Sequence, residues 1–172
     1  MIFQDPYESL NPRWTIKDII KEPLDIHNIG ALNDREEAVV EILRTVGLTP
    51  PENYLSRYPH EISGGQRQRV SIARTLIMKP KFVICDEPTS MLDVSIRISI
   101  MDLMLNLAKD LDVSYLYITH DLAVARYMCN RIAVMFNGKI VEIADTEDLL
   151  QNPIHPYTCL LYTSDAADEG SS

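Results

Sequence analysis

The sequence predicts an α/β domain with a mostly parallel sheet and helices that connect its strands. Two apolar runs, residues 81–85 and 113–119, are typical of buried strands, and a segment with helical periodicity follows each of them. The dipeptide Asn137-Gly138, between two further β runs, is a strong signal for a C-terminal β-hairpin. With 172 residues, the chain is long enough to bury a core.

The pattern of the first half of the chain predicts helices separated by loops. A short helical segment follows the turn "LNPRW" and is expected to stop near Pro23. A second helix is expected to start at a cap supplied by Asn33 or Asp34 and to end at Gly47. Residues 48–61 then form a proline-rich loop.

The second half is expected to contain further helices, the two strands and the hairpin. The segment "SGGQRQRVSIARTLIM" and residues 94–110 both place apolar side chains at helical spacing. Shorter helices are expected over "DLAVARYMC" and "TEDLLQNP". In open parallel sheets, ligands bind outside the carboxyl ends of the strands. Asp86, Glu87 and His120 fall at such ends, so we expect them to face the same crevice.

Composition favours a globular protein in a reducing compartment. The hydrophobic fraction is 46%, and no apolar run approaches the ~18 residues of a membrane span. Cys85, Cys129 and Cys159 are odd in number and lack metal-type spacing, which argues against a disulfide framework. The net charge of −9, without a basic stripe, argues against a nucleic-acid partner.

Residues 159–172 differ from the rest of the chain. The stretch "CLLYTSDAADEGSS" is small and acidic, and without Asp165, Asp168 and Glu169 the net charge of −9 becomes −6. One interpretation is a disordered terminus. We favour a non-native tail, because "CLLYTSDAADE" resembles a translated sequencing adapter. The domain is therefore expected to comprise residues 1–158.

The strand "FVIC" leads directly into two carboxylates, Asp86 and Glu87. The sheet fixes an acid at the end of a strand, so Asp86 can hold Mg²⁺ through its water shell. Glu87 can orient and deprotonate a water molecule that attacks a γ-phosphate. Taken alone, the sequence "DEP" is more often a simple polar exit from a strand.

The segment "SGGQ" precedes a helix that it can help to start. Ser63 can act as the N-cap, while Gly64 and Gly65 let a ligand approach free backbone amides, where the helix dipole favours an anion. Arg67 and Arg69 add positive charge close by. Two glycines alone are more typical of an ordinary turn before an amphipathic helix.

His120 ends the strand "YLYIT" and can hydrogen-bond a γ-phosphate or help to position the attacking water. In isolation, a satisfied core or capping histidine is the more common explanation. The histidines and Cys85 show no ligand spacing, so a zinc site is poorly supported.

Together these segments are far more specific than any one of them. The ordered motifs "FQDP", "SGGQRQRVSIARTL", "FVICDEPTSMLD" and "YLYITHDL" resemble the ATP-binding cassette family, the ATPase domains of ABC transporters. The resemblance implies a P-loop NTPase fold and spans residues 1 to about 158. The stretches "FQDPYESLNPRWTI", "RYPHEISGGQRQRV" and "NPIHPYT" are most similar to ATPase subunits of oligopeptide and dipeptide importers, including nickel-peptide relatives.

The resemblance implies a role for each residue of the hydrolysis site. Gln4 matches the Q-loop, which contacts Mg²⁺ or the lytic water and links the site to the membrane subunits. Asp86 would hold Mg²⁺ and Glu87 would be the general base, as the end of the Walker B strand. His120 would sense the γ-phosphate as the switch histidine.

The resemblance also implies a second half-site. The signature motif would clasp the γ-phosphate of ATP bound to an opposite ATPase subunit through Ser63, Gly64, Gly65 and a supporting Gln66. Asp93 in "SMLD" would couple the two sites across the dimer. Met91 replaces the commoner alanine of this motif, and we expect it to alter only packing at the interface.

The phosphate loop of the family is absent from the sequence. No G-x-x-x-x-G-K-[ST] motif occurs, and the only Gly-Lys pair, Gly138-Lys139, belongs to the hairpin. The backbone nest and the lysine that hold the β- and γ-phosphates are therefore missing. We expect a partial ABC ATPase domain that lacks the phosphate-loop βα unit and has an open sheet edge.

The leading interpretation is a C-terminal fragment of an ABC importer ATPase for peptides or related solutes, inactive alone. It would use ATP and Mg²⁺ as a head-to-tail homo- or heterodimer at the cytoplasmic face of the cell membrane. Transmembrane permease subunits would dock on residues 7–24 and the loop before Ser63, and a solute-binding protein would act indirectly. Two alternatives remain: a truncated, non-catalytic subunit that supplies only the signature motif, and a soluble ABC ATPase without a transport role.

Overall fold

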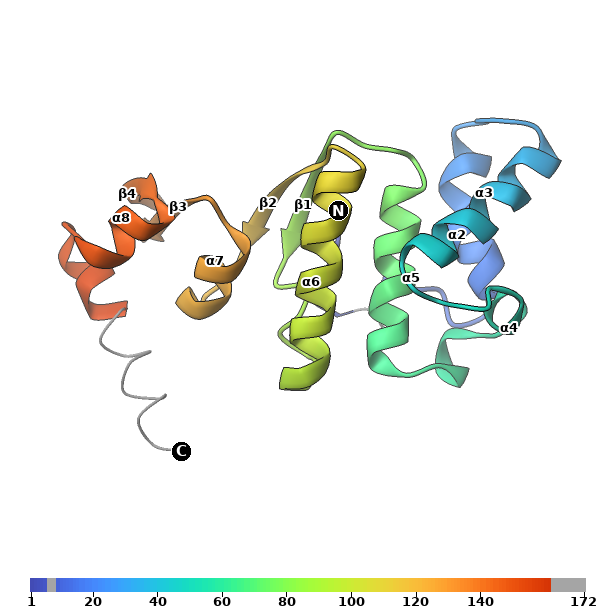
Figure 1. Ribbon diagram of the computed structural model, residues 1–172, viewed down its shortest axis with the longest axis horizontal. Coiled ribbons are helices and arrows are strands. Elements are labelled where there is room, and N and C mark those ends of the chain that lie inside the picture. The colour runs from blue at the N-terminus through green and yellow to red at the C-terminus, as the bar shows by residue number, and fades with distance from the viewer. Residues whose placement is uncertain (6–8, 162–172) are drawn as a thin grey trace. The chain divides into compact units, whose positions relative to one another are not determined.

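The structure is a computed structural model that describes residues 1–5 and 9–161 (Figure 1). The chain divides into two compact units, Met1–Leu116 and a second that starts at Tyr117. The first unit contains Gln4, the SGGQ segment and the two acids after the first predicted strand. The second unit contains His120 and the hairpin.

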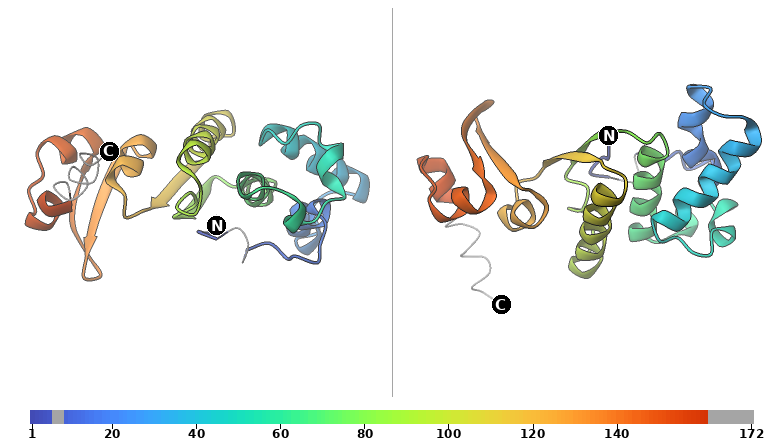
Figure 2. Two further views of the ribbon diagram at one scale, coloured as in Figure 1. Left: turned by 90° about the horizontal axis from the view of Figure 1, so that it is seen from below. Right: turned by 45° about the horizontal axis from the view of Figure 1, so that its top comes forward.

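Helices make up most of the first unit. The longer ones are α2 (Ile16–Ile26), α3 (Leu32–Thr45), α5 (Gly64–Leu76) and α6 (Val94–Asp110). The proline-rich loop contains two short turns, α4 (Glu52–Leu55) and the 3₁₀ helix η1 (Pro59–Glu61). α2 and α3 pack against α5, and α5 and α6 lie side by side (Figure 2).

α2 continues through Pro23, although the sequence predicts that it ends there. Thr15 caps the helix, because its Oγ1 accepts a hydrogen bond from Asp18 N at 3.2 Å. Pro23 removes its own N–H donor from the helix, but burial of the apolar face outweighs that loss. The buried side chains of this face are Ile16, Ile19, Ile20 and Leu24.

α3 begins earlier than the sequence predicts. Its N-cap is Ala31, and Asp34 Oδ2 accepts a hydrogen bond from Ala31 N at 3.1 Å. The prediction that Asn33 or Asp34 caps the helix is therefore wrong. The acid acts instead from the third helical position, back onto the amide of the N-cap residue.

The sheet of the first unit follows the predicted α/β pattern. β1 (Phe82–Asp86) pairs with β2 (Ser114–Ile118), and α6 connects the two strands. Ser114 N donates a hydrogen bond of 2.9 Å to Lys81 O at the start of this pairing. The expected parallel sheet with covering helices is confirmed.

The first residues of the chain lie along the other side of β1. Ile2 forms a parallel bridge with Cys85. Ile2 N donates to Ile84 O at 2.8 Å, and Asp86 N donates to Ile2 O at 2.9 Å. This pairing places Gln4 beside the carboxyl end of β1.

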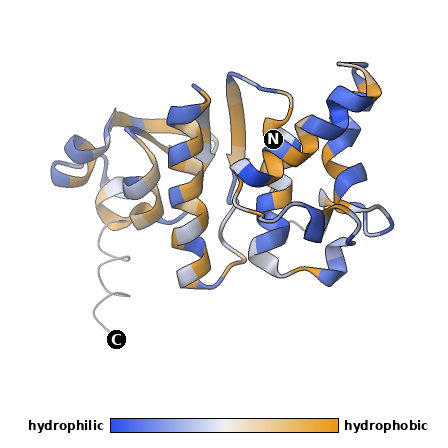
Figure 3. Cartoon of the chain, turned by 45° about the vertical axis from the view of Figure 1, so that its right-hand side comes forward, coloured by the Kyte–Doolittle hydropathy of each residue, from blue (hydrophilic) through white to orange (hydrophobic). Residues whose placement is uncertain are grey.

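The core of the first unit forms between the helices and β1. In Figure 3 its helices alternate between hydrophilic and hydrophobic colours, as expected for helices with one buried face. Removing these side chains from water is the main source of stability. The largest fully buried side chains include those of Ile2, Ile20, Leu43, Ile72, Leu76, Ile100 and Met104.

The second unit is built around the predicted hairpin. β3 (Arg131–Phe136) and β4 (Lys139–Asp145) pair antiparallel, and a β-bulge lies between Val134 and Met135. Asn137 and Gly138 both have positive φ, 48° and 75°, as a two-residue hairpin turn requires. The hairpin signal in the sequence is therefore confirmed.

Helices cover one side of this hairpin. α7 (Leu122–Met128) precedes it and α8 (Thr146–Gln151) follows it. The core of the unit is formed by Ala125, Ile132, Val134 and Leu149.

Residues 156–161 are also helical, so residues 159–161 of the expected tail continue this helix. Tyr157 packs its ring on Phe136 with 4.4 Å between centroids, and Leu161 packs against the core of the second unit. The expectation for residues 162–172 lies outside the described part of the chain. Within residues 1–5 and 9–161, no helix has both the length and the apolar character of a membrane span.

Candidate active site

The two acids after the first strand are held by a tight turn. Asp86 closes β1, and Glu87 follows it with a left-handed φ of 43°. Such a backbone costs a non-glycine residue roughly 1–3 kcal/mol and is often found at functional sites. Ser90 stabilises the turn, because its N and its Oγ both donate to Glu87 O, at 3.2 and 3.0 Å.

Gln4 contacts the second of these acids directly. Its Nε2 donates a hydrogen bond to Glu87 Oε2 at 3.1 Å. The parallel bridge at Ile2 brings the two side chains together, since it aligns the start of the chain with β1. With the nitrogen committed to Glu87, the Oε1 of Gln4 is the atom that can accept a hydrogen bond or bind a cation. The structure thus joins two residues that the sequence singles out separately.

An open depression of about 410 Å³ lies beside this pair. It is lined by Phe3, Gln4, Asp5, Ser9 and Asp86. Among the residues that the structure describes, no group of three or more His, Cys, Asp or Glu side chains could form a metal cage. Mg²⁺ commonly takes only one or two protein oxygens and completes its shell with waters and substrate phosphates. The Asp86 carboxylate and the Gln4 amide oxygen fit that mode of binding.

The SGGQ segment forms a complete capping box at the start of α5. Ser63 Oγ accepts a hydrogen bond from Gln66 N at 3.3 Å, and Gln66 Oε1 accepts one from Ser63 N at 3.0 Å. The predicted N-cap is therefore confirmed. Gln66 Nε2 also donates to the hydroxyl of Tyr54 at 3.4 Å. No local pattern in the sequence indicates this contact with Tyr54.

The two glycines of the segment have different surroundings. A Cβ on Gly65 would lie 2.7 Å from Ile96 Cγ2 of α6, closer than packed carbon atoms approach. A Cβ on Gly64 would lie at an ordinary 3.7 Å from Leu92 Cδ2. Packing therefore explains glycine at position 65. Glycine at 64 has no such packing reason, because a methyl group there would make only ordinary contacts.

The two arginines after this segment hold neighbouring loops. Arg67 is buried, and its Nη1 donates to the carbonyls of Pro59 and Ile62, at 2.9 and 2.6 Å. Arg69 donates to Val46 O at 2.6 Å and to Ser99 Oγ at 2.9 Å, and burial lowers its pKa. These hydrogen bonds show a structural role for both guanidinium groups, where the sequence suggests only a nearby positive charge.

Asp93 directly follows Leu92, whose side chain lies next to the start of α5. It is the N-cap residue of α6, where its carbonyl accepts a hydrogen bond from Arg97 N at 2.8 Å, and it is exposed. Leu92, the preceding residue, is the side chain nearest to Gly64. The first unit thus contains two clusters: Gln4 with the two acids, and the SGGQ segment with Asp93.

His120 belongs to the second unit, where it follows β2 and is exposed. The next residue, Asp121, caps α7, because its Oδ1 accepts a hydrogen bond from Val124 N at 3.0 Å. The expectation that His120 faces the same crevice as the two acids stays a prediction.

Comparison with known proteins identifies the family. The sequence model described as "ABC transporter" matches residues 1–90, which include Gln4, the SGGQ segment and both acids at the end of β1. The chain belongs to the ABC transporter family.

Relatives within the ABC transporter family extend the match along most of the chain. The oligopeptide transport ATP-binding protein OppF of Bacillus subtilis (strain 168) is 53% identical over 159 residues, which are 92% of this chain and 52% of that protein. The oligopeptide transport ATP-binding protein AmiF of Streptococcus pneumoniae serotype 4 is 52% identical over 165 residues, 95% of this chain and 53% of that protein. This ABC chain spans about half the length of both relatives.

A solved structure supports the ABC ATPase fold. The ATP-binding cassette MJ0796, in a dimeric post-hydrolysis state bound to ADP and Pi, matches with a TM-score of 0.68 and 29% identity. The match covers 84% of this chain and 63% of the other. The fold class predicted from the ordered motifs is therefore confirmed.

Proposed function

We propose that this chain acts in the ATP-hydrolysing subunit of an ABC importer for peptides or related solutes. The observation that carries the proposal is the hydrogen bond between Gln4 and Glu87, next to Asp86 at the end of β1. The three side chains to which we assign hydrolysis therefore come from one unit of the chain. The 53% identity to an oligopeptide transport protein supports the class of solute.

The proposed chemistry divides between the two acids and Gln4. Glu87 takes a proton from a water molecule as that water attacks the γ-phosphorus, and the bond to the β-phosphate oxygen breaks to release ADP. Asp86 and Gln4 Oε1 would hold the Mg²⁺ that accompanies ATP, through its water shell. When bound, that Mg²⁺ neutralises charge on the phosphates. Gln4 Nε2 keeps Glu87 oriented toward the water through the 3.1 Å contact.

The SGGQ cluster serves a second ATPase subunit. Ser63, Gly64 and Gly65 present their hydroxyl and backbone amides to the γ-phosphate of ATP on the partner, in a head-to-tail homo- or heterodimer. Gln66 braces this start of α5 through the capping box, and Asp93 faces the same interface. The lack of any steric need for glycine at position 64 supports this role, since a Cβ there would make only ordinary contacts. His120 senses the γ-phosphate in the chain's own site.

The 172 residues need a phosphate-binding loop that they do not themselves contain, since no Gly-Lys-Ser/Thr occurs among them. We therefore infer that this chain alone neither binds nor hydrolyses ATP. Isothermal calorimetry of the chain with millimolar ATP and Mg²⁺ should give no binding heat. Clear Mg²⁺-dependent binding would contradict this inference.

We propose that the permease subunits dock on α2. A groove of about 360 Å³ lies on that helix and is lined by Trp14, Asp18, Lys21, Glu22, Asp25 and Ile26. Part of the predicted docking segment, residues 6–8, lies outside the described part of the chain. The subunit would be peripheral, at the cytoplasmic face of the cell membrane, and a solute-binding protein would act through the permease.

Uptake into vesicles tests the transport function. A complete ATPase subunit that contains these residues is assembled with its permease and binding protein, and radiolabelled oligopeptide uptake is followed with and without ATP. We expect uptake that requires ATP and that stops in the Glu87→Gln variant. ATP hydrolysis without any coupled uptake would favour a soluble ABC ATPase instead.

A further inference from the structure

Hydrogen bonds from Arg74 of α5 connect Glu22 on α2 to Ser9, and Ser9 is hydrogen-bonded to Asp5, the residue that directly follows Gln4. We propose that Arg74 is a positioning residue that sets the Gln4 segment according to what is bound on α2. This inference rests on the proposed function, because it concerns how permease docking regulates the same hydrolysis site.

Arg74 contacts two different elements with the two ends of its guanidinium group. Nη1 donates to Ser9 O at 2.9 Å, and Nη2 donates to Glu22 Oε2 at 2.6 Å. The side chains of Arg74 and Glu22 are only 33% and 25% exposed, so solvent screens this ion pair less than a surface pair. The planar fork reaches the two acceptors from two separate nitrogens, a fixed geometry that the single ammonium nitrogen of lysine does not reproduce.

On one side, the contacts lead to the hydrolysis site. Ser9 N donates to Asp5 O at 3.3 Å, and Asp5 directly follows Gln4. Ser9 and Asp5 also line the depression beside Asp86. A shift of the Ser9 carbonyl therefore moves both a wall of this depression and the residue bonded to Gln4.

On the other side, the contacts lead to the surface of α2. Glu22 lines the groove on that helix together with Trp14 and Ile26, whose side chains are 39% and 67% exposed. A partner in the groove contacts Glu22 and changes how this carboxylate holds Arg74. Binding can regulate a site only through such a contact that differs between the bound and free states.

Other ion pairs anchor α2 without reaching the Gln4 segment. Lys17 pairs with Glu36 at 2.5 Å, and Asp25 pairs with Arg35 at 2.7 Å; both pairs join α2 to α3. The attachment of α2 to the unit therefore does not depend on Arg74 alone. The contact between Lys17 and Glu36 provides a matched control, since it involves the same helix.

The test measures how strongly the permease stimulates ATP hydrolysis. Phosphate release is compared between the complete subunit alone and the same subunit assembled with its permease. We expect Arg74→Lys to lower this stimulation by at least about fivefold, within the usual range of coupling between sites. The KM for ATP should change by less than about twofold, because the nucleotide contacts remain. Glu36→Gln should retain full stimulation.

Exchanging the charges of Glu22 and Arg74 distinguishes a positioning role of Arg74 from a role in fold stability alone. Glu22→Arg alone should lower the melting temperature, and adding Arg74→Glu should recover it by restoring an ion pair. Stimulation should not recover, because a carboxylate cannot donate a hydrogen bond to Ser9 O.

Two results would overturn the inference: full stimulation in Arg74→Lys, or recovery of stimulation together with the melting temperature in the swap. Either would show that Arg74 only stabilises the fold. A wild-type assembly that hydrolyses no ATP would instead overturn the proposed function, and this inference with it.

Discussion

The side-chain amide of Gln4 donates a 3.1 Å hydrogen bond to Glu87 Oε2, between residues 83 positions apart in the chain. The contact exists because the first residues of the chain pair with β1 through the bridge from Ile2 to Cys85. It relates the two functions proposed here: Glu87 performs the chemistry, and Gln4 connects that chemistry to the segment held by Arg74.

Replacing Gln4 with Glu should shift the pH dependence of hydrolysis. The variant places a second carboxylate against Glu87, and the like charges make it unfavourable for both groups to be ionised together. A general base must be ionised to work, so the acidic limb of kcat against pH should move to higher pH. Gln151→Glu, at an exposed position at the end of α8, is the matched control. An unshifted acidic limb in Gln4→Glu would argue against the pairing.

Replacing Gly65 with Ala should destabilise the chain, whereas the same change at Gly64 should not. The new methyl group at 65 would meet Ile96 Cγ2 at 2.7 Å, and overpacking of this kind costs about 1–3 kcal/mol. At 64 the contact is an ordinary 3.7 Å. Denaturant unfolding of the 172-residue chain measures both. Ile96→Leu, which removes Cγ2, should rescue Gly65→Ala; no rescue would show that the loss has another origin.

Because of Glu142, the free energy of unfolding of the chain should fall at acidic pH. Its pKa is lowered chiefly by the hydrogen bond from Thr158 Oγ1 (2.6 Å), and then by those from Ile154 N and His155 N. A carboxyl with a lowered folded-state pKa contributes stability that is present above its unfolded value and lost as pH falls through the folded one. This stability is therefore lost at pH values below 4.5, the ordinary pKa of a glutamate side chain.

Unfolding free energies measured from neutral pH down through this window test the prediction. The Glu142→Gln variant should lose part of the acid dependence, while Asp148→Asn, at an exposed acid on the adjacent α8, should keep it. Identical acid dependence in the wild type and Glu142→Gln would mean that the three hydrogen bonds do not favour the ionised form.

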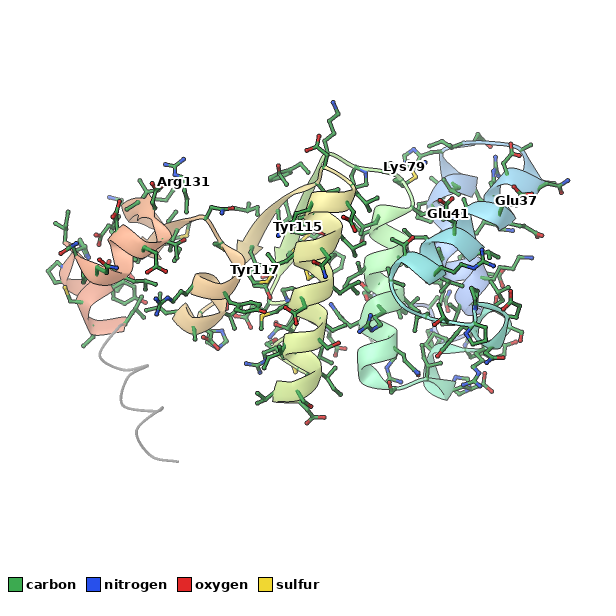
Figure 4. The ribbon with its side chains drawn as sticks, viewed as in Figure 1. Glu37, Glu41, Lys79, Tyr115, Tyr117 and Arg131 are labelled. Atoms are coloured by element: carbon green, nitrogen blue, oxygen red, sulfur yellow. The ribbon has the colours of Figure 1, made fainter. Side chains whose placement is uncertain are left out.

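Tyr115 offers a change that should not weaken the fold. Its hydroxyl is buried on β2 without a hydrogen-bond partner among residues 1–5 and 9–161, and burial raises its pKa (Figure 4). Tyr115→Phe should leave stability unchanged or raise it by up to about 1 kcal/mol, because it removes an unsatisfied polar atom. Tyr54→Phe, which removes the partner of Gln66, is the contrasting control and should destabilise. A clear loss in Tyr115→Phe would show that the hydroxyl is satisfied in solution.

Local chemistry explains what the sequence predicts correctly. The strand before Asp86, the cap at Ser63 and the hairpin turn at Asn137-Gly138 each depend on residues within a few positions of one another. Such patterns determine local structure wherever tertiary packing agrees with them. The end of α2 at Pro23 is the counter-example, because packing of its apolar face overrides the local signal.

Contacts distant in the sequence could not be predicted in this way. Arg74 meets Glu22 and Ser9 from positions 52 and 65 residues away, and Gln66 meets Tyr54 across the proline-rich loop. These pairs depend on how α2 and α5 pack, which no spacing along the chain encodes. The different requirements of Gly64 and Gly65 likewise appear only when α6 is in place.

The most direct test of the proposed ATPase is phosphate release by the Glu87→Gln variant of the complete subunit, assembled with its permease. Removing a general base typically slows turnover by about 10²–10⁴-fold and leaves ground-state binding largely intact. Glu37→Gln, at an exposed position of α3, is the control (Figure 4). We predict loss of turnover with retained Mg²⁺-ATP binding in Glu87→Gln, and wild-type turnover in the control. Turnover at the wild-type rate in Glu87→Gln would contradict the central claim that Glu87 is the base of an ABC ATPase.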